Sequence, residues 1–523
     1  MRVERRPRRR GRAVRRRRLE PRAAPPRRLV QGCSPVRQPR ARPAARAAQR
    51  HPAVAGRLRR VLGRDAAAGA HLLRPGGRAA LDPPQLDRRG AGPRAARRLD
   101  GGPPAALPRL GRARPRRGRR GPWAALVITH DVVVVGGGPV GVLAAALLAA
   151  RGLDVPVWER RAEEPSLSRA IGVHPPSLDV LDRVGAAKPL VADAVPVRRG
   201  VARSGGRTLG TVDFDRAHPR WPFVAALPQH RTEQLLRQRL ESLAPGSLRR
   251  GVSLDALEQE PERVLLHGTA EGRTVEAAAR FVIAADGARS SLRGALGIDA
   301  PLRRYPDRYV MCDVADDTGL GADAVVHLER RGVVESFPLP GGVRRFVVLL
   351  DADGDDDGDV GVVQDRDAAP DAELVASLVA ERTGLDLDPG TATMTSAFGV
   401  QRRLARRTVA GRVVLIGDAA HEISPIGGQG MNLGWLDAAA VAPVLARALR
   451  AAGGRRLDPA AFRAYEEARR RSVVRSARQA EINMALGRPV GTVVGAARQV
   501  GLSAALHLPT RRLLASLYSM RFV

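Results

Sequence analysis

The chain is poor in cysteine, lysine and aromatic residues. Its two cysteines, Cys33 and Cys312, are too few for a disulfide framework and argue against a cysteine-based metal site. Two free thiols in a reducing compartment are the ordinary interpretation. Lysine occurs once, at Lys188, against 87 arginines, so chemistry that needs a lysine has a single candidate position.

Long apolar runs are scarce as well. Residues 132–150 are nineteen in a row without a charge, which raises the alternative of a membrane-spanning helix. Three consecutive glycines and a proline within the run argue against that alternative. The N-terminal quarter shows no apolar run of signal-peptide type, although Arg-Arg pairs are frequent there.

The formal net charge of +35 is concentrated in the N-terminal quarter. Residues 1–125 carry 37 arginines and 6 acidic residues, a net charge of +31. The other 398 residues carry 51 basic and 47 acidic residues, a net charge of +4. The main part of the chain is therefore close to neutral and has enough apolar residues to build a core.

Residues 1–126 are rich in Arg, Pro and Ala and show no persistent helical or strand period, so we expect them to be disordered. One explanation is a basic arm that binds nucleic acid or anionic surfaces, although Trp123 would be its only aromatic residue. The other, which we favour, is a start codon placed too far upstream, with Val127 as the natural start. Mass spectrometry of the native N-terminus decides between them.

A strand, a glycine turn and a helix follow one another between Asp131 and Arg160. The four β-branched residues 132–135 suit a strand buried on both faces of a parallel sheet. Gly136, Gly138 and Gly141 then give the G-x-G-x-x-G pattern, which permits a tight turn, close approach of a pyrophosphate, and close helix–strand packing. The pattern predicts a dinucleotide site.

The residues after the glycines complete that pattern. A helix over residues 139–150 begins at Pro139, whose missing N–H costs nothing at a helix start, and its positive end faces the pyrophosphate. Residues 153–158 are expected to form the second strand. Glu159 follows, 18 residues after Gly141, where a carboxylate can accept hydrogen bonds from a ribose.

Two later blocks combine strands with acidic and glycine residues. In residues 281–293 a strand runs into Asp286-Gly287. In residues 411–439 a strand ends at Gly417-Asp418, a Pro/Gly-rich loop follows, and a helix starts at Met431-Asn432. Asp418 can bind hydroxyls, the loop glycines can approach a flat ring, and the helix N-terminus can stabilise negative charge on it.

Ordinary structural roles account for two other features. His421 after Gly417-Asp418 suggests a catalytic base, but a histidine that packs or caps locally is the better interpretation, and no G-x-S-x-G element exists for a hydrolase triad. Residues 351–359 carry six aspartates, yet their spacing does not fit an EF-hand, so a solvated loop is expected. No metal site is predicted.

The remaining segments predict a second sheet and a helical end. Strands are expected at residues 308–314, 324–328, 333–337 and 345–350, a hairpin at 264–267 and 274–278, a buried strand at 281–285, and helices at 371–383, 432–450 and much of 459–523. No internal repeat occurs.

The three motif blocks, in this order, resemble the class A FAD-dependent aromatic hydroxylases of the p-hydroxybenzoate hydroxylase type. The resemblance covers about residues 128–450, and the block from Gly417 to Asn432 is its most specific part. It implies an α/β fold with a Rossmann-like FAD-binding domain interleaved with a mixed β-sheet substrate domain, plus C-terminal helices and a disordered basic N-terminal extension. The expected domains are the N-terminal extension (1–126), an FAD-binding domain in three parts (127–199, 280–300 and 411–450), a substrate domain in two parts (200–279 and 301–410), and a C-terminal helical region (451–523).

The resemblance also implies which residues bind FAD. They fall into groups for the pyrophosphate, the adenosine, the diphosphate and ribityl chain, and the flavin ring. Of Gln229 and Arg231, it leaves open which contacts the flavin. The full set is Gly136, Gly138, Pro139, Gly141, Glu159, Arg160, Arg169, Gln229, Arg231, Asp286, Gly287, Asp418, Pro425, Gly428, Gly430, Met431 and Asn432.

The activity implied is a cytoplasmic monooxygenase in which NADPH or NADH reduces FAD, O2 adds at flavin C4a, and the hydroperoxide hydroxylates a phenolic, polyketide-like or quinone-type molecule. No catalytic residue is assigned; Pro425 would lie beside the flavin ring. Phe223, Phe337 and Phe346 are candidate pocket residues, with core packing as the alternative for each.

Two other enzymes share the scaffold: a geranylgeranyl-reductase-type alkene reductase, and a flavin halogenase. A halogenase needs a pocket lysine, and Lys188 is expected in a surface turn. Nucleic-acid binding through the extension is the non-enzyme alternative. We expect no nucleic-acid partner for the folded part and no transmembrane segment.

Overall fold

The computed structural model describes residues 129–164, 170–350, 371–451, 458–507 and 511–521. Three sequence predictions lie outside these residues: the disordered extension 1–126, Arg169 as a diphosphate contact, and the aspartate-rich loop 351–359. Among the described residues, no helix is long and apolar enough to cross a membrane, and no cluster of metal-ligating side chains is present.

The first sheet is built around β1 (Thr129–Val135), which lies between two parallel partners. The order is β17-β18-β11-β1-β2-β8, with β10 and β9 attached to β11. Residues 132–134 are fully buried, as the run of valines predicts. The other strands are β2 (Val157–Glu159), β8 (Leu248–Arg250), β9 (Val252–Gln259), β10 (Val264–Ala270), β11 (Arg273–Ala284), β17 (Val409–Ala410) and β18 (Val413–Leu415).

Strand β11 differs from its prediction. The expected hairpin strand 274–278 and the expected buried strand 281–285 form one continuous strand of 12 residues. Its first half pairs antiparallel with β10, and its second half pairs parallel with β1 and β18. This pairing places residues 248–270 in the first sheet, whereas the sequence assigned them to the substrate part. The wider division into domains stays a prediction.

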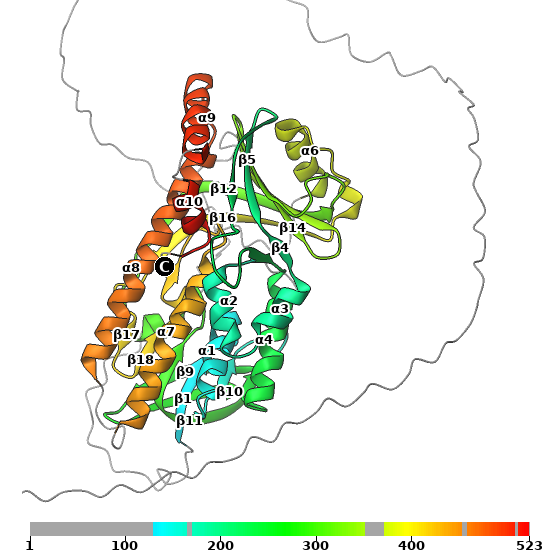
Figure 1. The fold of residues 1–523 in the computed structure, drawn as a ribbon. Helices are drawn as coiled ribbons and strands as arrows, with labels where there is room; N and C mark the ends of the chain where they lie inside the picture. Colours follow the sequence, from blue (N-terminus) through cyan, green and yellow to red (C-terminus); the bar gives the residue numbers. More distant parts are fainter. Residues whose placement is uncertain (1–128, 165–169, 351–370, 452–457, 508–510, 522–523) are drawn as a thin grey trace, which may run out of the picture. The chain divides into compact units, whose positions relative to one another are not determined.

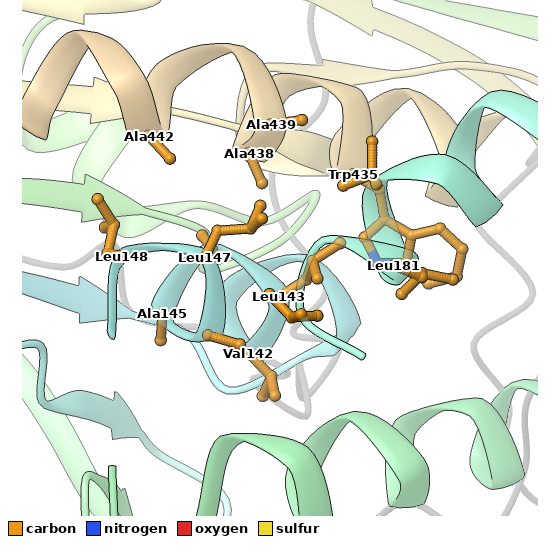
Figure 2. Close-up of a cluster of buried hydrophobic side chains, with 14 of the residues drawn as sticks. Val142, Leu143, Ala145, Leu147, Leu148, Leu181, Trp435, Ala438, Ala439 and Ala442 are labelled. Atoms are coloured by element: carbon orange, nitrogen blue, oxygen red, sulfur yellow. The ribbon is translucent and has the colours of Figure 1, made fainter. Parts of the chain in front are cut away.

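Helices pack on the first sheet through a close-fitting apolar interface (Figure 1). Helix α1 (Pro139–Ala149) starts where the sequence predicts, and its leucines face alanines of α7 (Gly430–Arg450), as Figure 2 shows. Small side chains let the two helix backbones approach, and Trp435 closes one end of the interface by donating its Nε1–H to the carbonyl of Pro139 at 3.0 Å. The N-terminal ends of two helices far apart in sequence are thereby fixed together.

The second sheet is mostly antiparallel, with the order β19-β16-β12-β15-β14-β13-β5-β6. All four strands predicted between residues 308 and 350 are present in it. Helix α6 (Ala372–Thr383) packs on one face, where it covers part of a separate apolar core (Figure 1). The strands are β5 (Arg199–Ser204), β6 (Arg207–Asp213), β12 (Leu302–Ala315), β13 (Ala324–Glu329), β14 (Gly332–Leu339), β15 (Val343–Leu349), β16 (Met394–Leu404) and β19 (His421–Glu422).

The end of the described chain is helical, as predicted. Helices α9 and α10 contact β6 of the second sheet, and α8 contacts β13 and α7. A small third sheet has the order β3-β7-β4. The remaining strands and α-helices are β3 (Gly172–Val173), β4 (Val195–Val197), β7 (Val224–Ala226), α2 (Pro175–Asp182), α3 (Ala187–Asp193), α4 (Gln229–Leu243), α5 (Ser291–Ala295), α8 (Pro459–Gly487), α9 (Thr492–His507) and α10 (Arg511–Tyr518).

Candidate active site

A single cavity of about 1170 Å³ runs from the glycine turn after β1 to one face of the second sheet. It collects most of the site residues predicted from the sequence. Those on its wall are Gly136, Gly138, Pro139, Glu159, Arg160, Gln229, Asp286, Gly287, Asp418, Pro425, Gly428, Gly430 and Met431.

The three glycines of the motif differ in what a side chain at each position would meet. Gly136 has a φ of +112°, and a Cβ there would meet the carbonyl oxygen of Ala285 at 2.2 Å. A Cβ on Gly141 would lie 1.9 Å from the carbonyl oxygen of Gly136, so this glycine is needed for helix–strand contact and does not line the cavity. Around Gly138, which does line it, a Cβ would meet no atom within 4 Å. Gly138 is also the residue directly before α1.

Glu159 is a buried carboxylate held by main-chain donors. Its Oε2 accepts a hydrogen bond from the N–H of Gly137 at 2.6 Å, and its Oε1 accepts one from the N–H of Arg161 at 3.0 Å. Burial opposes ionisation, but these hydrogen bonds and the Arg161 guanidinium, whose Nε donates to Oε1 at 3.1 Å, outweigh it, and the pKa of Glu159 is lowered. The carboxylate is thus ionised at neutral pH and fixed at the end of β2.

Asp286 follows β11 on the opposite side of the glycine turn. Its Oδ2 accepts a hydrogen bond from the N–H of Leu292 at 3.2 Å, whereas its Oδ1 is buried and has no partner. Arg293 in the following helix donates to the carbonyl oxygens of Ala288 and Ala419, both at 2.9 Å. This arginine links the Asp-Gly block to the Gly-Asp block, which the sequence alone did not reveal.

Asp418 projects into the cavity, surrounded by protein atoms but not covered by them. The surrounding protein limits hydration of the carboxylate, and this desolvation raises the pKa of Asp418 to about 6. The loop behind it is held by Asn432, whose Nδ2 donates to the carbonyls of Gly172 and Gly428, both at 2.9 Å, and whose Oδ1 accepts from the N–H of His174. Asn432 is fully buried and does not line the cavity; the structure gives it the role of holding the loop.

The two candidates at the start of α4 lie in different places. Gln229 is on the cavity wall. The guanidinium of Arg231 does not line the cavity; its Nε donates to Asp193 at 2.7 Å. Between the two, Gln229 is the one positioned to reach a bound molecule.

His421 packs locally, as the interpretation preferred from the sequence predicts. Its Nε2 lies 2.5 Å from Oδ2 of buried Asp437, whose Oδ1 accepts from Arg469 at 2.7 Å. Although burial opposes ionisation, the contacts with His421 and Arg469 keep the pKa of Asp437 well below its usual value. Asp437 also accepts the N–H of Gly417 at 3.0 Å, so the group fixes the Gly-Asp turn. His421 lines a second, smaller cavity of about 210 Å³ and not the main one.

The far end of the main cavity is lined by side chains of the second sheet. Strand alternation turns Val333, Glu335 and Phe337 of β14 toward the cavity and Val334 and Ser336 away from it. Of the three predicted pocket phenylalanines, Phe337 is therefore in place. The other two are not on the wall: Phe346 is fully buried in the core under α6, and Phe223 packs edge-on against Trp221.

Lys188 lies exposed on α3 and does not line the cavity. Sequence reasoning missed Glu335, Arg345 and Phe398, which do line it. The period-two pattern of residues 332–339 could have placed Glu335 on the same face as Phe337.

A model of the FAD binding domain family matches residues 129–480. The enzyme 12-dehydrotetracycline 5-monooxygenase/anhydrotetracycline 6-monooxygenase of Streptomyces rimosus subsp. rimosus is 34% identical over 322 residues, which cover 59% of this chain and 61% of that protein. Rifampicin monooxygenase of Streptomyces venezuelae is 33% identical over 311 residues, covering 59% and 62%. The match spans about three fifths of the length of these curated relatives.

Two solved structures are also similar to this chain. The OxyS anhydrotetracycline hydroxylase from Streptomyces rimosus superimposes with a TM-score of 0.61 and 29% identity, covering 76% of this chain and 77% of that one. The p-nitrophenol 4-monooxygenase PnpA from Pseudomonas putida superimposes with a TM-score of 0.65 over 75% of this chain and 98% of that one. At 24% identity, this second likeness concerns the fold alone.

Proposed function

Because the chain belongs to the FAD binding domain family, within the class A FAD-dependent aromatic hydroxylases, we propose that it is an FAD-dependent monooxygenase. Its substrate in this proposal is a phenolic, polyketide-like or quinone-type molecule, and NADPH or NADH is the reductant. Overall, substrate, O2, NAD(P)H and one proton give hydroxylated substrate, water and NAD(P)+.

The residues around the glycine turn fit the adenosine and diphosphate end of FAD. Gly138 leaves open space where a pyrophosphate would approach the first N–H groups of α1. Glu159 offers a fixed carboxylate to the ribose. Asp286 keeps one buried oxygen without a protein partner, an arrangement that suits a hydroxyl donor on the ligand.

The loop before α7 fits the other end of the cofactor. Asp418 would bind hydroxyls of the ribityl chain or the diphosphate, and Pro425 would lie against the flavin ring. Gly430 and Met431 begin α7, so their N–H groups have no partner in the preceding turn and are available to the pyrimidine edge. Gln229 faces the same space.

When bound, FAD supplies the oxygen chemistry, which the family locates at C4a of the flavin ring. The chain supplies position and exclusion of water. The second sheet offers a mainly apolar wall beyond the loop, formed by Val326, Val333, Phe337 and Val347 among others. Such a wall holds a flat apolar molecule against the flavin edge and keeps bulk water from the reaction.

The observation that carries the proposal is the continuity of one cavity from the dinucleotide motif to this apolar wall. Its volume exceeds the range of about 300–1000 Å³ typical of a site for one small ligand. Room for a cofactor and a substrate in contact is what a flavin hydroxylase requires.

The test uses purified protein loaded with FAD. We expect visible flavin absorbance, NAD(P)H oxidation accelerated by some members of a phenol and polyketide panel, and a product heavier by one oxygen atom. A product heavier by two hydrogen atoms would instead identify an alkene reductase. A colourless protein whose NAD(P)H oxidation no compound accelerates contradicts the proposal.

A further inference from the structure

Glu335 stands out on the apolar wall of the cavity. It lies in the middle of β14, opposite Val326 of β13 and Val347 of β15, with Val333 and Phe337 on either side along its own strand. Its neighbours on the wall are thus hydrocarbon, and the carboxylate itself lines the cavity.

Charged groups near Glu335 are already paired. Arg345, on the same face, binds Asp313 through two hydrogen bonds of 2.6 and 2.7 Å. Asp307 and Arg488 form a second two-bond pair, at 2.8 and 2.7 Å. Within the described part of the chain, no side-chain hydrogen bond or ion pair reaches the carboxyl group of Glu335, and burial alone raises the pKa of this group to about 7.

A second polar group on this face also lacks a partner. Tyr309 of β12 stacks on Phe398 with ring centroids 5.5 Å apart, and its hydroxyl is buried without a hydrogen bond. Tyr518 of α10 does not serve Glu335, because its hydroxyl donates to Asn483 at 3.1 Å. The Glu335 carboxyl group therefore has no hydrogen-bond donor among the described residues, in surroundings where an unpaired carboxylate is costly.

We propose that Glu335 accepts a hydrogen bond from a phenolic or enolic hydroxyl of the substrate, and that this bond fixes which edge of a flat apolar molecule faces the flavin. This inference deepens the proposed function and rests on it. It narrows the substrate class to flat, mainly apolar molecules with a hydroxyl group at one edge. A fully apolar ligand would leave the carboxylate unmatched.

The test compares 2-naphthol with its methyl ether, 2-methoxynaphthalene, in which a methyl group replaces the hydroxyl hydrogen. Each is titrated by calorimetry into the FAD-loaded protein at pH 8, where Glu335 is ionised. We expect the wild type to bind 2-naphthol about tenfold or more tightly than the ether, since a hydrogen bond to a charged group is being compared with none.

Variants assign that preference to one carboxylate. Glu335→Leu abolishes it, and Glu335→Gln reduces it severalfold because a neutral amide oxygen accepts more weakly. Glu258→Gln, an exposed carboxylate on β9, keeps the wild-type ratio. A ratio unchanged in Glu335→Leu, or no binding of 2-naphthol by the wild type, overturns the inference.

The outcome is separable from that of the proposed function. Calorimetry reports binding whether or not the protein turns over, and flavin content is measured on the same samples. If flavin binds and NAD(P)H oxidation responds to phenols while the Glu335 variants leave the ratio unchanged, the specificity role alone fails. If no flavin binds and no compound accelerates oxidation, the proposed function fails.

Discussion

The two ends of the cavity are built in different ways. At the first end, main-chain N–H groups, glycines and carboxylates with main-chain partners surround the space. At the second end, side chains from an antiparallel sheet line it, and most are apolar. A backbone-built site tolerates little change because the chain itself is the ligand-binding group, whereas a wall of side chains can change without altering the fold.

The largest effect expected from this comparison is at Gly141. In Gly141→Val the side chain would collide with the Gly136 carbonyl, 1.9 Å from the Cβ position, and neither backbone can move without separating α1 from β1. We expect little or no folded protein, measured by thermal denaturation without added FAD. Gly138→Ala is the matched control: with open space at its Cβ, it keeps the apo melting temperature and weakens FAD binding alone. Normal folding of Gly141→Val would contradict the backbone account.

At the second end of the cavity, two phenylalanine substitutions distinguish a core residue from a residue of the cavity wall. Phe346→Ala should cost about 3–5 kcal/mol of unfolding free energy because the ring is fully buried under α6. Phe337→Ala should cost clearly less, since its ring borders the cavity, and should change the response to different substrates. Denaturant unfolding and substrate-panel kinetics measure the two effects. Equal costs would mean that the wall is part of the core.

Glu159 tests the first end of the cavity. In Glu159→Gln the ionised acceptor becomes a neutral amide, so we expect FAD affinity to fall about 10- to 100-fold. Quenching of flavin fluorescence on binding gives the dissociation constant. Glu276→Gln, an exposed carboxylate on β11, is the control and should bind FAD as the wild type does. An unchanged constant in Glu159→Gln would remove this residue from the ribose site.

The smallest expected effect concerns the pH dependence of stability at Glu335. Its folded-state pKa of about 7 exceeds its ordinary value of 4.5, so between these pH values the folded chain holds a proton that the unfolded chain releases. Stability therefore falls as pH rises through this window. The titratable and charged groups on this face are Tyr309, Tyr518, and the Asp307–Arg488 and Asp313–Arg345 pairs.

Glu335→Gln removes that dependence. Without substrate, the variant should exceed the wild type in unfolding free energy by about 1–3 kcal/mol at pH 8, and the gain should vanish near pH 4.5. Chemical denaturation at several pH values measures it. A gain that does not change with pH would assign the effect to packing and not to charge.

The sequence predicted the first end of the cavity far better than the second. Glycine spacing, buried valine runs and Asp-Gly turns are local patterns, and the residues that they single out, Gly136, Gly138, Glu159, Asp286 and Asp418, all line the cavity. These patterns follow from main-chain geometry, which neighbouring residues determine.

Prediction failed where long-range packing decides. Nothing local distinguishes Phe346, in the core, from Phe337, on the wall, until β15 is paired with β14 in register. Arg231 and Asn432 have side chains that could bind a cofactor, but both are hydrogen-bonded within the protein. Arg231 binds Asp193, and Asn432 binds the carbonyls of Gly172 and Gly428. Strand β8 joins the first sheet only because β2 is its neighbour, a pairing over about 90 residues of chain.

The pairing of β1 with β11 and of β11 with β18 also means that the first sheet cannot be completed until late in synthesis of the chain. Residue 413 leaves the ribosome 278 residues after residue 135, a delay of roughly 15–55 s at ordinary rates of synthesis. For about the first half of that interval β1 lacks its neighbour β11, and to the end of it the sheet lacks β18 and Pro139 lacks the indole of Trp435. The flavin pocket is therefore a late product of translation, and the exposed valines are a hazard for aggregation until it is made.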